Sequence, residues 1–214
     1  MREPVLVLLL VSACSSHPPA LQDSHGVSGG SGGSGTGGGA GAPQGQTTNA
    51  DTTRYAEGEQ LDPSLSWQGY AAGSDTLGKV SLADYQDPDG SRGVNALLIE
   101  EDSVTCPACK VMSGELPGRL AGGWAAEGVA ILQLVILDAN LKWAGPEAAL
   151  AWKQAFGASW AVGADPTFTF SRAGKNTLPV QVLIDPRTLT LVHRSFGYQS
   201  SYPELDDLVA KNAH

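Results

Sequence analysis

Apolar residues gather in short runs along the second half of the chain, and their pattern predicts several strands. The segment "GVAILQLVILDAN" (128–140) is rich in branched residues behind a glycine, which predicts a buried strand. "VNALLI" (94–99) predicts another buried strand, and "VSLADY" (80–85) predicts a shorter one before it. The segment "DPDG" (87–90) between these two has the composition of a turn.

Two stretches show helical spacing of their apolar residues instead. Glycines and Pro117 interrupt the first stretch, so we expect a kinked helix from about Pro107 to Glu127. The second helix is predicted over Pro146–Phe156, because this stretch begins with proline and ends before Gly157.

The end of the chain predicts a hairpin and a closing helix. "LPVQVLIDPRTLTLVHRSFGY" (178–198) predicts two strands joined by a turn at 185–187. A helix follows in "SYPELDDLVAKNA" (201–213), where Ser201 and Glu204 are spaced as a capping box. A strand–helix–strand unit gives parallel neighbours and a hairpin gives antiparallel ones. We therefore expect an α/β fold with a central mixed β-sheet and helices on both faces.

Composition and charge narrow the classes of function. The 214 residues, 42% of them hydrophobic, suit one domain with a tail. The net charge of −9 argues against nucleic acid as a partner, because nucleic-acid binding needs a basic face. After the first dozen residues no apolar run is long enough to span a membrane. Three cysteines are too few for a disulfide framework, so each needs its own explanation.

The N-terminus explains the first cysteine. Val5–Val11 is a short apolar run typical of a signal peptide. It leads into Val-Ser-Ala-Cys (11–14), which resembles the lipobox of bacterial lipoproteins. The resemblance implies a signal peptide over 1–13, acylation of Cys14 and anchoring in a membrane. Family rules take the Ser15 that follows as permitting export to an outer membrane. Cleavage by the ordinary signal peptidase is the alternative.

The segment 14–66 is predicted to be an unfolded tether. From Gly26 to Gly45, eleven of twenty residues are glycine, and such a composition buries too little surface to offset the entropy of ordering. A Gly/Ser coil of ~50 residues has a reach of roughly 40 Å. The repeat "GGSGGSG" also resembles an engineered linker, but behind a lipobox we interpret it as native. Folding is predicted to begin near Trp67 and to continue to residue 214.

The other two cysteines form the motif Cys106-Pro107-Ala108-Cys109, between a predicted strand and a predicted helix. Unpaired N–H groups and the helix dipole at a helix N-terminus favour the thiolate, which is the form that attacks a disulfide. We therefore expect Cys106 to be the nucleophile. Cys109, about one turn later, can resolve the mixed disulfide by intramolecular attack.

Residues ~70–214 resemble the thioredoxin-like fold, a three-layer sandwich, and within it the TlpA/ResA-like thiol–disulfide oxidoreductases. The Cys-x-x-Cys motif after a buried strand, "TLPVQVLID" (177–185) about seventy residues later, and "GY" before a final helix carry the resemblance. It implies that Pro179 is a cis-proline beside the dithiol and that Leu178 offers backbone to a substrate strand. Pro107 and Ala108 would also contact the substrate.

A buried acid assists proton transfer at the second cysteine of thioredoxins, and Glu100 stands at the matching spacing, six residues before Cys106. A solvated acid is the alternative, because Glu101 and Asp102 follow it. The chain also departs from the family. Thr105 stands where tryptophan usually precedes the first cysteine, and Met112 stands where the branch often has glutamate.

Other functions remain open at this point. A structural zinc site needs four ligands, and of the four histidines only His193 is well placed, on the predicted hairpin. Copper-delivery proteins of the same fold space their cysteines three apart, not two. Peroxiredoxins place a threonine near the reactive cysteine, as Thr105 is here, but their longer motif is absent. A binding module with a structural disulfide is the last alternative, although so short a loop constrains little chain.

We therefore expect a membrane-tethered, extracytoplasmic thiol–disulfide oxidoreductase without a cofactor or a metal. Its partners would be protein thiols and disulfides of the cell envelope, on the periplasmic or extracellular side. A monomer is expected. The motif leaves open whether the dithiol reduces or oxidises its substrates.

Overall fold

The structure is a computed structural model that describes residues 54–171 and 177–213. The predicted signal peptide, Cys14 and most of the predicted tether therefore lie outside the described residues. Within the described part, no helix is long and apolar enough to cross a membrane.

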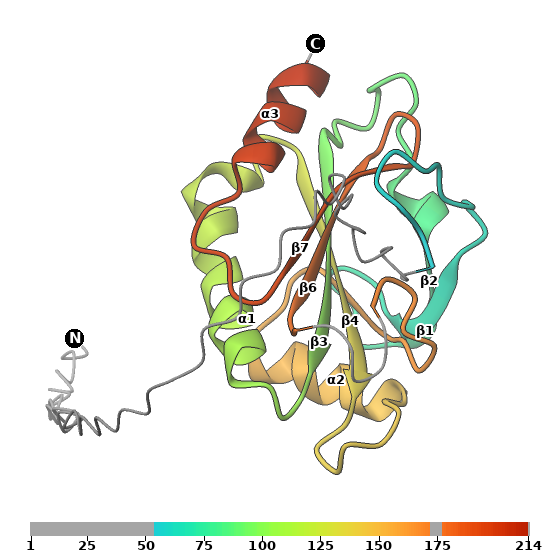
Figure 1. Ribbon diagram of the computed structural model, residues 1–214, viewed down its shortest axis with the longest axis vertical. Coiled ribbons are helices and arrows are strands. Elements are labelled where there is room, and N and C mark those ends of the chain that lie inside the picture. The colour runs from blue at the N-terminus through green and yellow to red at the C-terminus, as the bar shows by residue number, and fades with distance from the viewer. Residues whose placement is uncertain (1–53, 172–176, 214) are drawn as a thin grey trace, which may run out of the picture. The chain divides into compact units, whose positions relative to one another are not determined.

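The described residues build one sheet of seven strands in the order β2-β1-β5-β4-β3-β6-β7 (Figure 1). The strands are β1 (Ser66–Tyr70), β2 (Leu77–Ser81), β3 (Ala96–Ser103), β4 (Val129–Leu137), β5 (Ala161–Ala164), β6 (Val180–Asp185) and β7 (Thr190–Phe196). The neighbours β3, β4 and β5 are parallel, while β6–β7 and the pairs of β1 are antiparallel. This confirms the predicted mixed sheet.

The helices agree closely with the sequence pattern. They are α1 (Pro107–Arg119), α2 (Pro146–Ala155) and α3 (Pro203–Asn212), with a 3-10 helix η1 (Leu82–Tyr85) and a π-helical segment η2 (Leu120–Trp124). The helix predicted over 107–127 is kinked as expected, because α1 passes into η2 and Gly123 leaves helical geometry with φ 147°. The capping box at Ser201 and Glu204 does not form, since α3 starts after Tyr202 and has no side-chain cap.

The two faces of the sheet are covered differently. Successive side chains of β4 point to opposite faces of the sheet and belong to two different hydrophobic clusters. Ile131 and Val135 pack with residues of α1 and α2, whereas Leu132 and Leu134 pack on the other face. The helix α3 packs beside α1 against β3 and β6, in a third cluster with Leu98 (Figure 1). All three α-helices of the described part thus cover one face.

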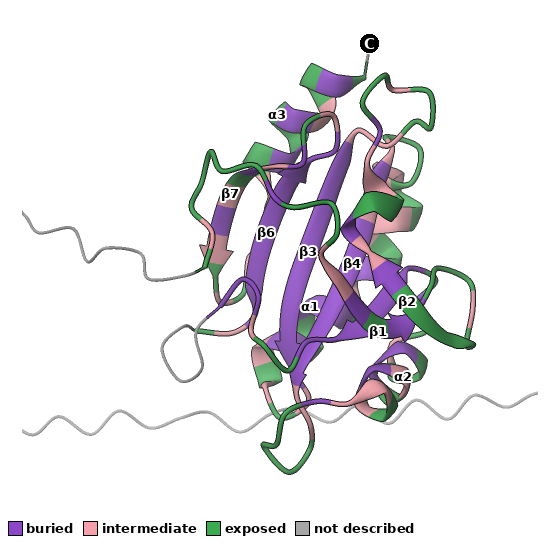
Figure 2. Cartoon of the chain, turned by 90° about the vertical axis from the view of Figure 1, so that its right-hand side faces the viewer, coloured by how far each residue is buried: buried purple, intermediate pink, exposed green. Residues whose placement is uncertain are grey.

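The other face is covered by η1 and by irregular segments (Figure 2). Leu82 of η1, Phe170 and Leu61 are almost fully buried there. The backbone of residues 58–61 is hydrogen-bonded to β7 and to the residue before it: Gly58 N–H donates to Leu191 O at 2.8 Å, and Leu61 N–H donates to Leu189 O at 2.9 Å. The predicted start of folding near Trp67 is therefore too late, since residues before it already contribute to the core. The predicted α/β class with a central mixed sheet is confirmed, but the α-helices do not lie on both faces as expected, because a 3-10 helix and irregular segments form the second outer layer.

Two strands were not predicted, and small residues explain why. β5 has the sequence Ala-Val-Gly-Ala, and β1 contains Gly69, which pairs with Gly163 of β5. A Cβ on Gly69 would lie 2.4 Å from the Val162 carbonyl oxygen, so the two strands approach more closely than side chains allow. The strand predicted over 80–85 ends at Ser81, where Ser81 N–H donates to the Asp84 carboxylate at 2.8 Å and starts the 3-10 helix.

Candidate functional site

The two cysteines of the motif are joined in a disulfide at the start of α1. β3 ends at Ser103, and a short turn delivers Cys106 to the position that caps the helix. The Cα atoms of Cys106 and Cys109 are 5.3 Å apart. Cys106 is half-buried and Cys109 has no exposed surface. Only Cys106 is therefore open to a sulfur atom of another molecule.

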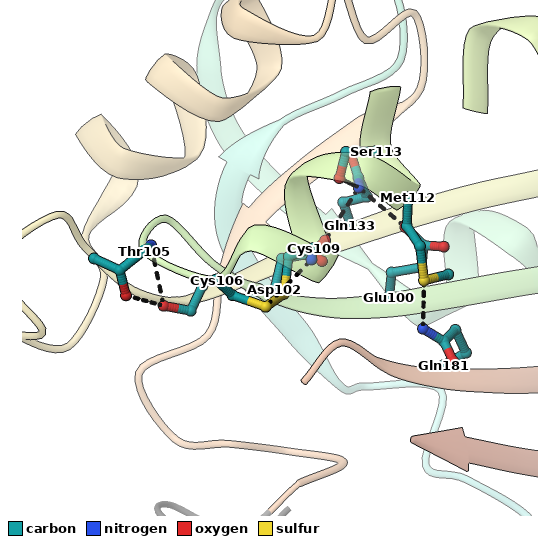
Figure 3. Close-up of a disulfide and its surroundings, with 10 residues drawn as sticks. Glu100, Asp102, Thr105, Cys106, Cys109, Met112, Ser113, Gln133 and Gln181 are labelled. Carbon is teal, nitrogen blue, oxygen red and sulfur yellow. Dashed lines mark hydrogen bonds between the residues drawn. A yellow bond between two sulfur atoms is a disulfide. The ribbon is translucent and has the colours of Figure 1, made fainter. Parts of the chain in front are cut away.

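The helix start stabilises charge on Cys106. The Sγ atom of Cys106 accepts a hydrogen bond from the Cys109 N–H at 3.2 Å (Figure 3). Pro107 stands at the first helical position, where a backbone N–H would have no partner within the helix. The remaining N–H groups and the helix dipole favour a negative sulfur, so the reduced Cys106 is suited to be the thiolate.

Pro179 lies beside this pair in space. The peptide bond between Leu178 and Pro179 is cis. Leu178 is half-buried and packs in the same hydrophobic cluster as both cysteines, and Pro179 is buried at the start of β6. The structure therefore brings together all the residues predicted for the dithiol and the substrate strand.

Three acids of β3 are buried, and they point to both faces of the sheet. Glu100, Glu101 and Asp102 have no exposed surface. Burial raises the pKa of Glu100 to about 7. Burial, with the charge of Glu100 next in importance, holds the pKa of Asp102 well above its usual range. The prediction that Glu100 points inward is confirmed, and the alternative of a solvated acid is wrong.

Glu101 faces the opposite side of the sheet from its two neighbours. Its Oε1 accepts a hydrogen bond from the Phe170 N–H at 2.6 Å. Burial, and then the charge of Asp165, raises the pKa of Glu101 to about 8. This acid lies across the sheet from α1, so it belongs to the packing of the second face and not to the dithiol.

One amide connects the other two acids. Gln133 Nε2 lies 3.1 Å from Glu100 Oε2, 3.1 Å from Asp102 Oδ2 and 2.7 Å from Ser113 Oγ (Figure 3). Trp160 Nε1–H donates to Gln133 Oε1 at 2.7 Å. Because indole can only donate, this bond fixes which end of the amide is oxygen. The Gln133 NH₂ group must therefore face the acids.

No protein-family model and no curated protein matches the chain. Solved structures do match it. A secreted thiol-disulfide isomerase from Corynebacterium glutamicum is 15% identical, covering 71% of this chain and 85% of that one, with a TM-score of 0.51. A candidate thiol:disulfide interchange protein DsbE from Chlorobium tepidum is 17% identical, covering 73% and 99%, with a TM-score of 0.50. A reduced 2-Cys peroxiredoxin from Plasmodium vivax is 18% identical, covering 74% and 82%, with a TM-score of 0.53.

The chain has the thioredoxin-like fold. At these sequence identities the likeness shows the fold alone. Two of the three structures are named for thiol–disulfide chemistry, and the third is named as a peroxiredoxin. The Cys106–Cys109 disulfide stands at the helix start of this thioredoxin-like domain.

Several residues of the thioredoxin-like site were not predicted from the sequence. Gln133 is a single polar residue within an apolar strand, and Ser113 is one within a helix, so neither stands out in the sequence. Trp160 lies in a segment without a periodic pattern. Asp102 was noted only as a neighbour of Glu100. The alternation of a buried strand was the available signal, because it places Glu100 and Asp102 on one face and Glu101 on the other.

The remaining candidates lie apart from the dithiol. His193 is on β7, 3.4 Å from the Glu57 carboxylate. Among the described residues no group of three potential ligands could hold a metal ion. Met112, where the resembling branch often has glutamate, is buried, and its sulfur accepts a hydrogen bond from Gln181 Nε2 at 3.2 Å.

An apolar groove borders the dithiol on the side of α2. Its volume is about 370 Å³. Val104 and Lys110, on either side of the Cys-x-x-Cys motif, form one wall, and Trp152 of α2 and Phe156 just after this helix form the other. A substrate that reaches Cys106 would therefore find apolar surface next to the reactive sulfur.

Proposed function

We propose that this protein is a thiol–disulfide oxidoreductase that exchanges disulfides with other proteins through Cys106 and Cys109. One observation carries the proposal: a half-buried cysteine caps a helix, and its fully buried partner is bonded to it one turn later. The residues around the pair fit this role, since Leu178 packs in the same hydrophobic cluster as both cysteines and is joined by a cis peptide bond to Pro179, just before β6.

The exchange has two steps. In the reducing direction, the Cys106 thiolate attacks a substrate disulfide, forms a mixed disulfide and releases one substrate sulfur as a thiolate. Cys109 then loses its proton and attacks Cys106 Sγ, and the second substrate sulfur leaves. The dithiol has given two electrons to the substrate and is now the disulfide. The opposite direction runs through the same mixed disulfide.

The surrounding residues support these steps. The backbone of Leu178 would pair with an extended substrate segment, and Pro107 and Ala108 would contact that segment beside Cys106. Glu100 would take part in the proton transfer of Cys109, because it is buried on the face of β3 that α1 covers. These roles follow the resemblance to thioredoxins together with the positions of the residues.

We also propose where the protein acts. The N-terminal pattern supports removal of residues 1–13, a lipid on Cys14, and a domain held at the surface of a membrane outside the cytoplasm. Protein thiols and disulfides of the cell envelope would then be its partners, and the chain would act as a monomer. Replacing Cys14→Ser is expected to move the protein from the membrane fraction to the soluble fraction, and unchanged fractionation would contradict the anchor.

Turnover of a model disulfide tests the function. The purified full-length protein is expected to accelerate reduction of insulin by dithiothreitol. Cys106→Ser and Cys109→Ser are each expected to lower the rate to that of dithiothreitol alone, whereas Cys14→Ser keeps the rate of the wild type. If both variants of the motif match the wild type, the proposed function is wrong.

A further inference from the structure

The Gln133 NH₂ group has fewer hydrogen atoms than there are oxygen atoms within hydrogen-bond distance of its nitrogen. Its NH₂ group has two hydrogens, yet Glu100, Asp102 and Ser113 each place an oxygen within hydrogen-bond distance of the nitrogen. The second carboxyl oxygens, Glu100 Oε1 and Asp102 Oδ1, are buried and accept no hydrogen bond of ordinary geometry from the described residues, although the Tyr202 hydroxyl approaches Glu100. Two ionised carboxylates held by one amide would be mutually repulsive and poorly solvated. The pair is therefore suited to hold one proton between its two members.

The register of α1 against β3 places Asp102 at the level of Cys109. Glu100 pairs with Gln133 across β3 and β4, and the Gln133 amide contacts Ser113 as well as both acids, so Ser113 lies over the pair of acids. One turn back along α1 is Cys109, a step of ~6 Å on the same helix face. One pleat forward along β3 is Asp102, a step of ~6.6 Å on the same strand face.

Because α1 runs back along the strand that leads into it, these two steps go in the same direction. Cys109 therefore lies toward the Asp102 end of the pair of acids. Cys109 also packs in the cluster that contains Val135, which is the neighbour of Asp102 on β4. In Figure 3, Asp102 stands at the end of the cluster where the cysteines are, and Glu100 stands farther from them.

We propose that Asp102 is the group that exchanges a proton with Cys109, and that Asp102 and Glu100 hold one proton between them while the Gln133 amide donates to both. This inference rests on the proposed function and adds a second acid to it. Glu100, the acid at the spacing that the sequence indicated, becomes the second carboxyl of the pair. Its protonation state influences that of Asp102.

The proton transfer completes the second step of the exchange. In the mixed disulfide at Cys106, the proton of the carboxyl pair is on Glu100, and the Cys109 thiol passes its own proton to the ionised Asp102 carboxylate. The Cys109 thiolate forms a bond to Cys106 Sγ while the bond between Cys106 and the substrate sulfur breaks. The substrate leaves as a thiolate and takes a proton from water, and the carboxyl pair, which now holds two protons, releases one of them to water.

Other charged and titratable groups lie near Glu100 and Asp102 and influence the pKa values of these two carboxyls. Arg119 and Glu115 of α1 act on Glu100, and Tyr202 approaches it from the segment before α3. Glu101 acts on Asp102 from the same strand. The charge of Arg119 lowers the pKa of Glu100 and the charge of Glu115 raises it, so these two neighbours act on Glu100 in opposite directions.

The reaction with an aromatic disulfide reagent releases two molecules of thionitrobenzoate in turn, and the two release rates report separately on Cys106 and Cys109. The reduced full-length Cys14→Ser protein, in which only Cys106 and Cys109 can react, is mixed with one equivalent of 5,5′-dithiobis(2-nitrobenzoate) in a stopped-flow instrument. The first thionitrobenzoate reports attack by Cys106, and the second reports attack by Cys109 on the mixed disulfide. Both rates are measured from pH 5 to 9.

Asp102→Asn is expected to slow the second release at least about tenfold at pH 7, with the first release within about twofold of the wild type. In Asp102→Asn, the rate of the second release is expected to rise with pH only in the range where the Cys109 thiol ionises without the help of a carboxylate. Glu100→Gln is expected to shift the pH midpoint of the second release with a smaller loss of rate. Asp207→Asn, at an exposed acid on α3, is the matched control and leaves both releases unchanged.

A second release in Asp102→Asn with the rate and pH profile of the wild type would overturn the inference. Asp102→Glu keeps a carboxyl and is expected to keep a pH-dependent second release, which guards against an asparagine variant that fails to fold. Loss of that pH dependence in Asp102→Glu would also overturn it. A wild-type protein that shows no second release at all would instead contradict the proposed function.

Discussion

Cys106 and Cys109 differ in exposure and in what surrounds them, and this difference assigns their roles. Cys106 is half-buried at a helix start, and Cys109 is fully buried in the cluster that α1 forms with β4 and α2. The position of the pair could be predicted from the sequence, because a buried strand, a turn and a helix start can each be recognised locally. The burial of Asp102 could not, since three consecutive acids usually mark a solvated segment and only the pairing of strands on both sides buries them.

Glu101 offers a test of that burial through the pH dependence of stability. Its pKa is raised from 4.5 to about 8 in the folded protein, so between these values the folded state holds a proton that the unfolded chain has lost. The free energy of unfolding therefore falls as pH rises through this window, by up to ~1.4 kcal/mol per pH unit for one such group. Glu101→Gln cannot titrate and is expected to lose less stability between pH 5 and pH 8. Urea unfolding at the two pH values measures this, and an unchanged difference would show that Glu101 is not buried as described.

At the scale of the elements, long periodic segments were predictable and short strands of small residues were not. The strands β3, β4, β6 and β7 and the helices α1, α2 and α3 follow patterns that apolar periodicity reveals. β1 and β5 depend on each other, because glycines at both partners let the backbones meet. No local pattern of a single sequence shows such a tertiary approach.

The pairing of β1 with β5 predicts different effects at two glycines. A Cβ on Gly69 would overlap the Val162 carbonyl oxygen, whereas Gly78, its partner on β2, has nothing within 4 Å of such a Cβ. Gly69→Ala is expected to lower the free energy of unfolding by ~1–3 kcal/mol through strain. Gly78→Ala, in the same hairpin, is expected to change it by less than ~0.5 kcal/mol. Equal effects in urea unfolding would be incompatible with the close approach of β1 and β5.

At the scale of the whole molecule, the segment before the first strand closes one face of the domain. The sequence predicted a tether up to residue 66, because glycine-rich composition gives way to the core only gradually. Leu61 is nevertheless 1% exposed, and residues 58–61 pair with β7 at the edge of the sheet. A single apolar residue in polar surroundings carries no periodic signal, so its burial depends on the finished fold.

Leu61 should therefore behave as a core residue. Leu61→Ala is expected to lower the free energy of unfolding by ~2–5 kcal/mol, because it leaves a cavity against β7 and Phe170. Leu77→Ala removes a leucine that is 54% exposed and serves as the control, with an expected change below ~0.5 kcal/mol. Similar stabilities of the two variants would place the start of the folded domain after Leu61.

Trapping of the mixed disulfide tests the central claim most directly, namely that Cys106 attacks and Cys109 resolves. Each full-length variant, in the Cys14→Ser background, is reduced and mixed with a peptide disulfide, and the adduct is located by mass spectrometry. Cys109→Ser is predicted to accumulate a stable adduct at Cys106, because no second thiol can resolve it. Cys106→Ser is predicted to form none, because Cys109 is buried. Absence of the adduct in Cys109→Ser, or an equal adduct at Cys109 in Cys106→Ser, would contradict this account.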